Sequence, residues 1–314
     1  MKITITGSLG HISKPLAQEL VQKGHNVTVI SHNPERQKDI EAMGAMASIG
    51  SIDDVAFLTT AFTGADAVYT MIPPSSDQGF TDPTNKNVFI GVMERCNKIM
   101  NNYAQAIQQS GIKRVVHLSS IGAHLEKGSG LLILHHNAEA ILNRLQNPSE
   151  EGRAGVDITF MRPVGFYYNL LGFIPVIKSM GMIASNYGAD DMIPWVSPID
   201  IATNIVDEIT TTIEGRKVRY VASEQITCNE VASILGAAIG KPDLKWILIP
   251  DEQLQSGMEK AGVPESIASG LVEMQASMHK GIMYEDYYLN KPELGKIKLS
   301  NYAKEFAAMY NQNA

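Results

Sequence analysis

Cysteine is nearly absent from the sequence, which has only Cys96 and Cys228 among its 314 residues. The two lie far apart and form neither a C-x-x-C pair nor the spacing of a zinc motif. Disulfide-rich and zinc-stabilised folds depend on such patterns. We therefore expect a fold that depends on its apolar core, with no bound metal and no disulfide framework.

Positive charge and long hydrophobic runs are also scarce. The formal net charge is −7, whereas nucleic-acid binders need a dense cationic surface, so we expect no direct contact with nucleic acid. The most apolar stretch, "LLGFIPVIKSMGMIA", is interrupted by Pro175 and Lys178 and is too short to cross a bilayer. The first residues already have a strand pattern in place of a signal peptide. We expect a cytoplasmic protein without membrane association.

Short β-branched runs alternate with amphipathic helical patterns through the first half of the chain. Examples are the strand pattern "NVTVIS" and the helical patterns "KPLAQELVQKG" and "NVFIGVMERCNKIMNNYAQAIQQSG". This alternation is typical of an α/β fold in which helices cover both faces of a doubly wound parallel sheet. After about residue 150 the rhythm changes, and from "DEQLQSGMEKAG" onward the chain is mostly helical.

Gly7, Gly10 and Ser13 occupy the turn between the first predicted strand and the first predicted helix. In dinucleotide-binding proteins the first glycine permits the tight turn and the second lets the backbone approach a pyrophosphate. The third position must be small so that helix and strand can pack. The helix that follows directs its amides and its positive dipole end at the phosphates. The alternative is that the glycines serve only the geometry of the turn.

The end of the second predicted strand reads "VISHNPERQ" and carries no Asp or Glu at its tip. An acid there would bind the 2′-hydroxyl of NAD, whereas a basic residue accommodates the 2′-phosphate of NADP. Ser31, His32, Asn33 and Arg36 are available instead, so the pattern favours NADP, with NADPH preferred over NADH. The alternative is that Arg36 is a solvated residue in a first helical turn.

The chain resembles the NmrA-like family of atypical short-chain dehydrogenases/reductases, close to the NAD(P)H-dependent quinone and azo-dye reductases. The resemblance covers nearly the whole chain, and the order and spacing of its motifs carry it. The matching stretches are "ITGSLGHISKPLAQEL", "NPERQ", "RVVHLSSIGA", "HHNAEAIL", "ITFMRPVGFYYNL", "WVSPIDIA" and "ITCNEVASILGAAIGKP".

This resemblance implies a Rossmann-type domain and a smaller, α-rich substrate domain with a cleft between them. We place the first at residues 1–162, with a segment at about 195–222 returning to it, and the second at 163–314. The expected cofactor-binding residues are Gly7, Ser8, Leu9, Gly10, His11, Ile12, Ser31, Asn33, Arg36, Met71, Ile72, Pro73, Ser119, His135, Pro163 and Phe166.

The wider superfamily uses a Tyr-x-x-x-Lys pair, in which the tyrosine donates a proton to the substrate oxygen. Glu139 fixes the frame here and puts His135 at the lysine position and Leu131 at the tyrosine position. The pair is therefore missing, which disfavours carbonyl–alcohol chemistry by the usual mechanism. His135 either binds the ribose or relays a proton, since its unperturbed pKa lies near neutrality, or it makes only a structural hydrogen bond. The adjacent His136 points about 100° away on the helix and is expected at the surface or facing a partner.

His135, Ser119 and Tyr167 are the expected catalytic residues. In the resembling family the "HLSS" strand ends beside the nicotinamide, and the segment after Arg162 lines cofactor and substrate. Phe166 and Tyr167 are candidates for stacking on a flat acceptor, together with Asn169. The alternative is that these rings belong to the core between the domains. Pro73 and Pro74 would stiffen the loop along the nicotinamide ribose.

Hydride transfer from NADPH to a quinone-like or other flat conjugated acceptor is the function that these features favour. The missing Tyr and Lys fit equally well a non-catalytic NAD(P)-binding redox sensor that contacts other proteins. A sugar-nucleotide epimerase is disfavoured, because it too needs the Tyr-x-x-x-Lys pair. We expect a monomer or a homodimer.

Overall fold

The computed structural model describes residues 1–73, 87–146 and 155–312. Its centre is a seven-stranded parallel sheet in the order β10-β6-β5-β4-β1-β2-β3. The predicted doubly wound parallel sheet is therefore confirmed. The strands are β1 (Lys2–Ile5), β2 (Asn26–Ser31), β3 (Met46–Ile49), β4 (Ala67–Met71), β5 (Arg114–Leu118), β6 (Asp157–Pro163) and β10 (Arg216–Val221).

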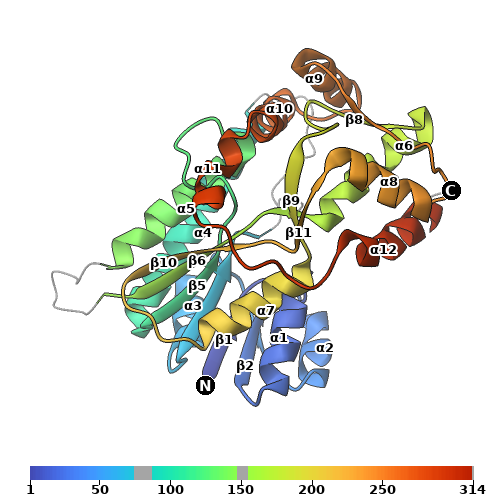
Figure 1. Cartoon of the computed structure of the whole chain (residues 1–314). Coiled ribbons are helices and arrows are strands. Elements are labelled where there is room, and N and C mark those ends of the chain that lie inside the picture. The colour runs from blue at the N-terminus through green and yellow to red at the C-terminus, as the bar shows by residue number, and fades with distance from the viewer. Residues whose placement is uncertain (74–86, 147–154, 313–314) are drawn as a thin grey trace.

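Helices cover the two faces of this sheet in separate groups (Figure 1). Each helix turns an apolar stripe to the strands; Leu16, Ala17 and Leu20 of the first helix are fully buried, for example. On one face lie α1 (Ser13–Gln22), α2 (Gln37–Ala42) and α7 (Pro198–Ile209), and on the other α3 (Val55–Phe62), α4 (Val88–Ser110) and α5 (Ile133–Asn143).

A second lobe, built from residues 164–197 and 222–312, lies beyond the end of the sheet that is opposite the N-terminus (Figure 1). Two small sheets form its centre, in the orders β11-β9-β7 and β12-β8. Its strands are β7 (Gly165–Phe166), β8 (Ile183–Ser185), β9 (Met192–Val196), β11 (Glu224–Thr227) and β12 (Trp246–Leu248). Its helices are α6 (Ile174–Met180), α8 (Cys228–Ala238), α9 (Asp251–Lys260), α10 (Glu265–His279), α11 (Glu285–Leu289) and α12 (Leu299–Gln312).

Short 3₁₀ segments join these elements: η1 (Pro34–Arg36), η3 (Gly130–Leu132), η4 (Arg144–Gln146), η5 (Tyr167–Phe173) and η6 (Ile282–Tyr284). Among the described residues, no helix has both the length and the hydropathy that a bilayer crossing needs.

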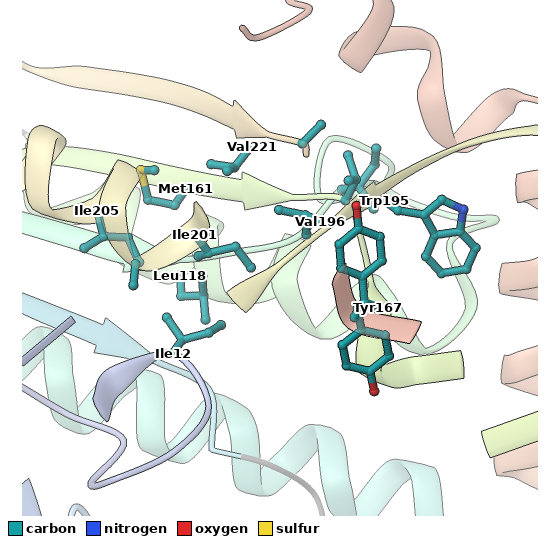
Figure 2. Close-up of a cluster of buried hydrophobic side chains, with 14 of the residues drawn as sticks. Ile12, Leu118, Met161, Tyr167, Trp195, Val196, Ile201, Ile205 and Val221 are labelled. Atoms are coloured by element: carbon teal, nitrogen blue, oxygen red, sulfur yellow. The ribbon is translucent and has the colours of Figure 1, made fainter. Parts of the chain in front are cut away.

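One apolar core runs from the sheet into the second lobe without a break. Figure 2 shows part of it, where Ile12 and Leu118 of the sheet side approach Tyr167 and Trp195 of the lobe. Of the segment at about 195–222, α7 and β10 lie with the central sheet, whereas the end of β9 lies in the lobe. The division into domains at residue 162 stays a prediction.

Candidate functional site

The turn after β1 is closed so tightly that only glycine fits at its first position. Gly7 has φ +88°, a conformation that costs other residues free energy. A methyl carbon on Gly7 would lie 2.5 Å from the sulfur of Met71 and would also collide with the hydroxyl oxygen of Ser13. Ser13 in turn donates a hydrogen bond to the carbonyl of Thr6 (3.0 Å). The small third residue therefore packs helix α1 against strand β1, as the sequence predicted.

Ser8 connects this turn to the end of β2. Its amide donates to the carbonyl of Ile30 (3.2 Å) and its hydroxyl donates to the hydroxyl of Ser31 (2.9 Å). Gly10 donates to the carbonyl of Gly7 (3.1 Å), and a methyl on Gly10 would meet that same oxygen at 3.2 Å. The backbone around Gly10 therefore lies close to the surface that a ligand would approach.

A cavity of about 580 Å³, here called the larger cavity, opens beyond the carboxyl ends of β1, β4 and β5. The strand order reverses between β1 and β4, which is where open α/β sheets bind their ligands. The sheet side of the lining consists of Gly7, Gly10, His11, Ile12, Ser13, Met71, Ile72, Leu118, Ser119, Ser120, Ile121, Leu132 and His135.

The second lobe supplies the opposite side of the larger cavity, mostly with rings and methionines. None of the described residues that line this cavity is Asp, Glu, Lys or Arg. The lobe contributes Val164, Gly165, Phe166, Tyr168, Asn169, Phe173, Tyr187, Trp195, Leu271, Met274, Gln275, Met278, Met283 and Tyr284. Such a lining suits a flat apolar molecule.

His135 lines the larger cavity with a neutral ring. Burial lowers the pKa of His135 to about 4, although Glu139 acts in the opposite direction. Its Nδ1 is buried and has no hydrogen-bond partner within the described part of the chain. The alternative prediction, that His135 makes only a structural hydrogen bond, therefore has no support at Nδ1. The adjacent His136 is half-buried and bonds the carbonyl of Ala123 (3.1 Å).

Ser119 reaches the cavity wall from the end of β5, but its proton is already used. Its hydroxyl donates to Glu139 at 2.6 Å, and Glu139 forms a buried ion pair with Arg162 at 2.7 Å. Arg162 also pairs with Asp286 of α11 at 3.0 Å. Ser119 can therefore only accept a hydrogen bond from a ligand, and its predicted catalytic role is limited to that.

The prediction that Tyr167 faces a flat acceptor was wrong. Tyr167 is fully buried in the apolar core (Figure 2). Its hydroxyl donates to Glu224 at 2.7 Å, and its ring stacks on Tyr302. Its neighbour Tyr168 lines the cavity instead and stacks on His11, with the ring centroids 5.0 Å apart. Adjacent residues of the 3₁₀ segment η5 (Tyr167–Phe173) point in different directions, and here Tyr167 enters the core while Tyr168 lines the cavity.

A second cavity of about 410 Å³, here called the smaller cavity, shares Gly7 and Met71 with the larger one. Arg95 of α4 faces it and is held by Asp53, with Nη2 2.7 Å from Oδ2. Lys98 lies 3.4 Å from Asp53 as well. The described lining consists of Gly7, Ser8, Ile30, Ser31, His32, Ser51, Ile52, Asp53, Met71, Pro73, Arg95 and Tyr103.

Four predicted cofactor residues lie outside both linings. Arg36 is exposed on η1, and Asn33 uses its side chain to accept from the amide of Glu35 at 2.9 Å. Leu9 packs on the core. The carbonyl of Pro163 accepts from the amide of Ile121 at 2.9 Å. Among the described residues that line the smaller cavity, Arg95 is the only Lys or Arg, and the sequence did not indicate it. Pro74 lies outside the described residues.

The two cavities meet at Gly7 and Met71, beside the glycine turn. Gly7 and Gly10 supply the close backbone approach, and α1 begins directly behind them. The described residues hold no group of three or more His, Cys, Asp or Glu side chains that could bind a metal ion.

The sequence profile of the NmrA-like family matches residues 1–301. The chain belongs to this family. The resemblance seen in the sequence is therefore confirmed. The Rossmann-type sheet, the glycine turn and the cavity described above are features of a member of this family.

Named relatives of this NmrA-like chain are reductases. It is 29% identical over 243 residues to the (4-alkanoyl-5-oxo-2,5-dihydrofuran-3-yl)methyl phosphate reductase of Streptomyces griseus, covering 76% of this chain and 74% of that protein. It is 25% identical over 275 residues to the NAD(P)H azoreductase of Xenophilus azovorans, covering 87% and 86%.

A solved structure supports the fold: the NADPH-dependent quinone oxidoreductase of Escherichia coli, in complex with NADPH, superposes with a TM-score of 0.75 at 19% identity. The match covers 96% of this chain and 99% of that one.

At the position of the superfamily tyrosine, this NmrA-like chain has Leu131 packed away from the larger cavity. Leu131 lies against α10, so close to Gly270 that a methyl group there would collide with it. Neither Leu131 nor any carboxylate of the described residues faces the cavity. The usual proton donor of carbonyl reduction is therefore missing from this position.

Proposed function

We propose that the protein is an NAD(P)H-dependent reductase whose acceptor is a flat conjugated molecule such as a quinone or an azo compound. The observation that carries the proposal is the larger cavity, which combines the glycine turn with a lining of aromatic rings and no charged side chain among the described residues. The activities of the named relatives, an azoreductase and a furan phosphate reductase, support the same class of reaction.

The residues around the glycine turn fit a dinucleotide cofactor. Gly7 and Gly10 would face its pyrophosphate, the smaller cavity would hold its adenosine end, and His135 and Ser119 would lie near the nicotinamide end. We propose NADPH over NADH. Arg95 lines the smaller cavity, and Lys98, which lies outside its lining, is the second cation beside the carboxylate of Asp53, at 3.4 Å. These three groups together carry one formal positive charge, which favours an additional phosphate.

When bound, a reduced nicotinamide would supply a hydride, and with one proton from solvent this converts a quinone to a hydroquinone. The chain itself contributes binding, orientation and exclusion of water. Tyr168 is a poor proton donor, because burial raises its pKa to about 12. The neutral His135 ring can bind a ribose hydroxyl through its unpartnered Nδ1.

A steady-state assay with NADPH, one quinone and one aliphatic ketone tests the proposal through the absorbance of the reduced nicotinamide. We expect oxidation of NADPH by the quinone and none by the ketone. A ketone needs general-acid help, which is worth about 10²–10⁴ in rate, whereas a quinone spreads the developing charge over its ring. His135→Ala should lower the quinone rate only modestly, through looser cofactor placement.

Efficient turnover of the ketone would refute the proposed acceptor class. Tight binding of NADPH with no turnover of the quinone would favour the second candidate, a non-catalytic NAD(P)-binding redox sensor, which the absence of a proton donor at Leu131 also permits. The expected monomer or homodimer stays a prediction.

A further inference from the structure

We propose that the larger cavity selects an uncharged acceptor and that Gln275 of α10 donates a hydrogen bond to a carbonyl oxygen of that acceptor. This inference rests on the proposed function, because it names the substrate class of the same site. Two observations support it: the absence of charged side chains from the described lining, and the hydrogen bond from Ser185 that orients the Gln275 amide.

The lining gives a charged acceptor no partner. Its described residues include no Asp, Glu, Lys or Arg, and the ring of His135 is neutral at pH 7. Behind Ser119, the buried Glu139 and Arg162 form an ion pair at 2.7 Å, and Arg216 and Asp286 complete a cluster with no formal net charge. An unpaired charge that is moved from water into such a site loses several kcal/mol of hydration, so a charged substituent on the ring would be rejected.

Gln275 has a side-chain amide that is oriented to donate a hydrogen bond to a carbonyl oxygen in the cavity. The hydroxyl of Ser185, which is 1% exposed, donates to Oε1 of Gln275 at 2.7 Å. With the oxygen occupied by Ser185, the two N–H groups of the amide remain, and Gln275 lines the larger cavity. A half-buried amide donor favours a ligand that offers an oxygen over one that does not.

Ser185 is itself fixed by the second lobe. It pairs with Leu248 in the β8–β12 sheet, and its carbonyl accepts from the amide of Ile249 at 2.9 Å. The orientation of the Gln275 amide is therefore set before a ligand arrives. Gln275 comes from the second-lobe side of the lining, whereas Gly7 and Gly10 come from the sheet side, so we assign Gln275 to the acceptor.

The test compares 1,2-naphthoquinone with 1,2-naphthoquinone-4-sulfonate, in binding by calorimetric titration with NADP⁺ present and in steady-state assays with NADPH. We expect the neutral quinone to bind at least about tenfold more tightly than the sulfonate. Gln275→Leu should weaken the neutral quinone about three- to tenfold, with the KM for NADPH unchanged. Ser185→Ala should act in the same direction by a smaller factor.

Gln253→Leu, on the exposed surface of α9, is the matched control and should change neither constant. Unchanged quinone affinity in a folded Gln275→Leu protein, equal binding of the two quinones, or binding of neither would overturn the inference. Selective binding of the neutral quinone without turnover would support the inference and refute the proposed reductase. The binding arm thus separates the two conclusions.

Discussion

Replacement of Gly7 by alanine should be one of the most damaging single-methyl changes in the chain. The φ of +88° costs a residue with a Cβ about 1–2 kcal/mol. The new methyl group also has to displace Ser13 and Met71, and overpacking of this kind costs about 1–3 kcal/mol. Together we expect Gly7→Ala to lower the free energy of unfolding by about 2–5 kcal/mol.

Gly64 offers a matched control, because it has φ +78° but open space where the methyl group of an alanine would lie. Gly64→Ala should therefore carry only the conformational cost of about 1–2 kcal/mol. The difference between the two variants, measured by urea unfolding, isolates the packing contribution. Ser13→Ala in the Gly7→Ala background should recover part of the loss, since it removes one of the two colliding groups. Equal destabilisation by Gly7→Ala and Gly64→Ala would refute the reasoning.

Three other predictions concern binding and pH. Gly10→Val should abolish dinucleotide binding, because a branched side chain fills the space the pyrophosphate needs; calorimetric titration beside an unchanged circular-dichroism spectrum checks this, and retained affinity would make the turn purely structural. Arg95→Ala should weaken NADPH about 10- to 100-fold and NADH much less, whereas Arg36→Ala changes neither; equal losses of both cofactors would contradict the role of Arg95. Burial lowers the pKa of His117 to about 3, so the unfolded state takes up the proton below pH 6.5. The contribution of the neutral His117 ring to the free energy of unfolding is therefore fully present above that pH and declines as the pH falls toward 3. From pH 7 to pH 5 the free energy of unfolding should drop by about 2 kcal/mol through this residue; an equally steep drop in a folded His117→Phe protein would exclude His117 as the source.

The strand–turn–helix unit at the N-terminus could be predicted because its determinants are local. Alternation of apolar residues defines β1, and Gly7 and Ser13 meet across a single turn. The capping box of α8 is also determined locally, since Thr227 and Glu230 stand three residues apart and bond each other in the structure.

Other parts of the candidate site depend on contacts between distant segments. Arg36 stands next to the second strand in the sequence, but Arg95 reaches the smaller cavity from α4. Tyr167 and Tyr168 lie in the 3₁₀ segment η5, for which neither helical nor strand periodicity tells which ring enters the core. Nothing in the sequence near Gln275 indicates that Ser185 holds its amide, because that contact joins α10 to a strand of only three residues.

The two cavities share Gly7 and Met71 but differ in the charge of their linings. Because of this difference, a change in ionic strength should affect binding at the smaller cavity and not at the larger one. At 0.15 M salt, charges on the surface are screened over about 8 Å, so Arg95 and Lys98, whose side chains are 38% and 62% exposed, lose attraction for a phosphate as salt is added. The larger cavity has no charged lining among the described residues, and the buried pair behind it is shielded from counterions. Salt would therefore loosen the hold on a phosphorylated ligand while leaving the affinity for a neutral ring nearly constant. In the intact protein, a salt titration can thus vary the occupancy of one end of the site without disturbing the other.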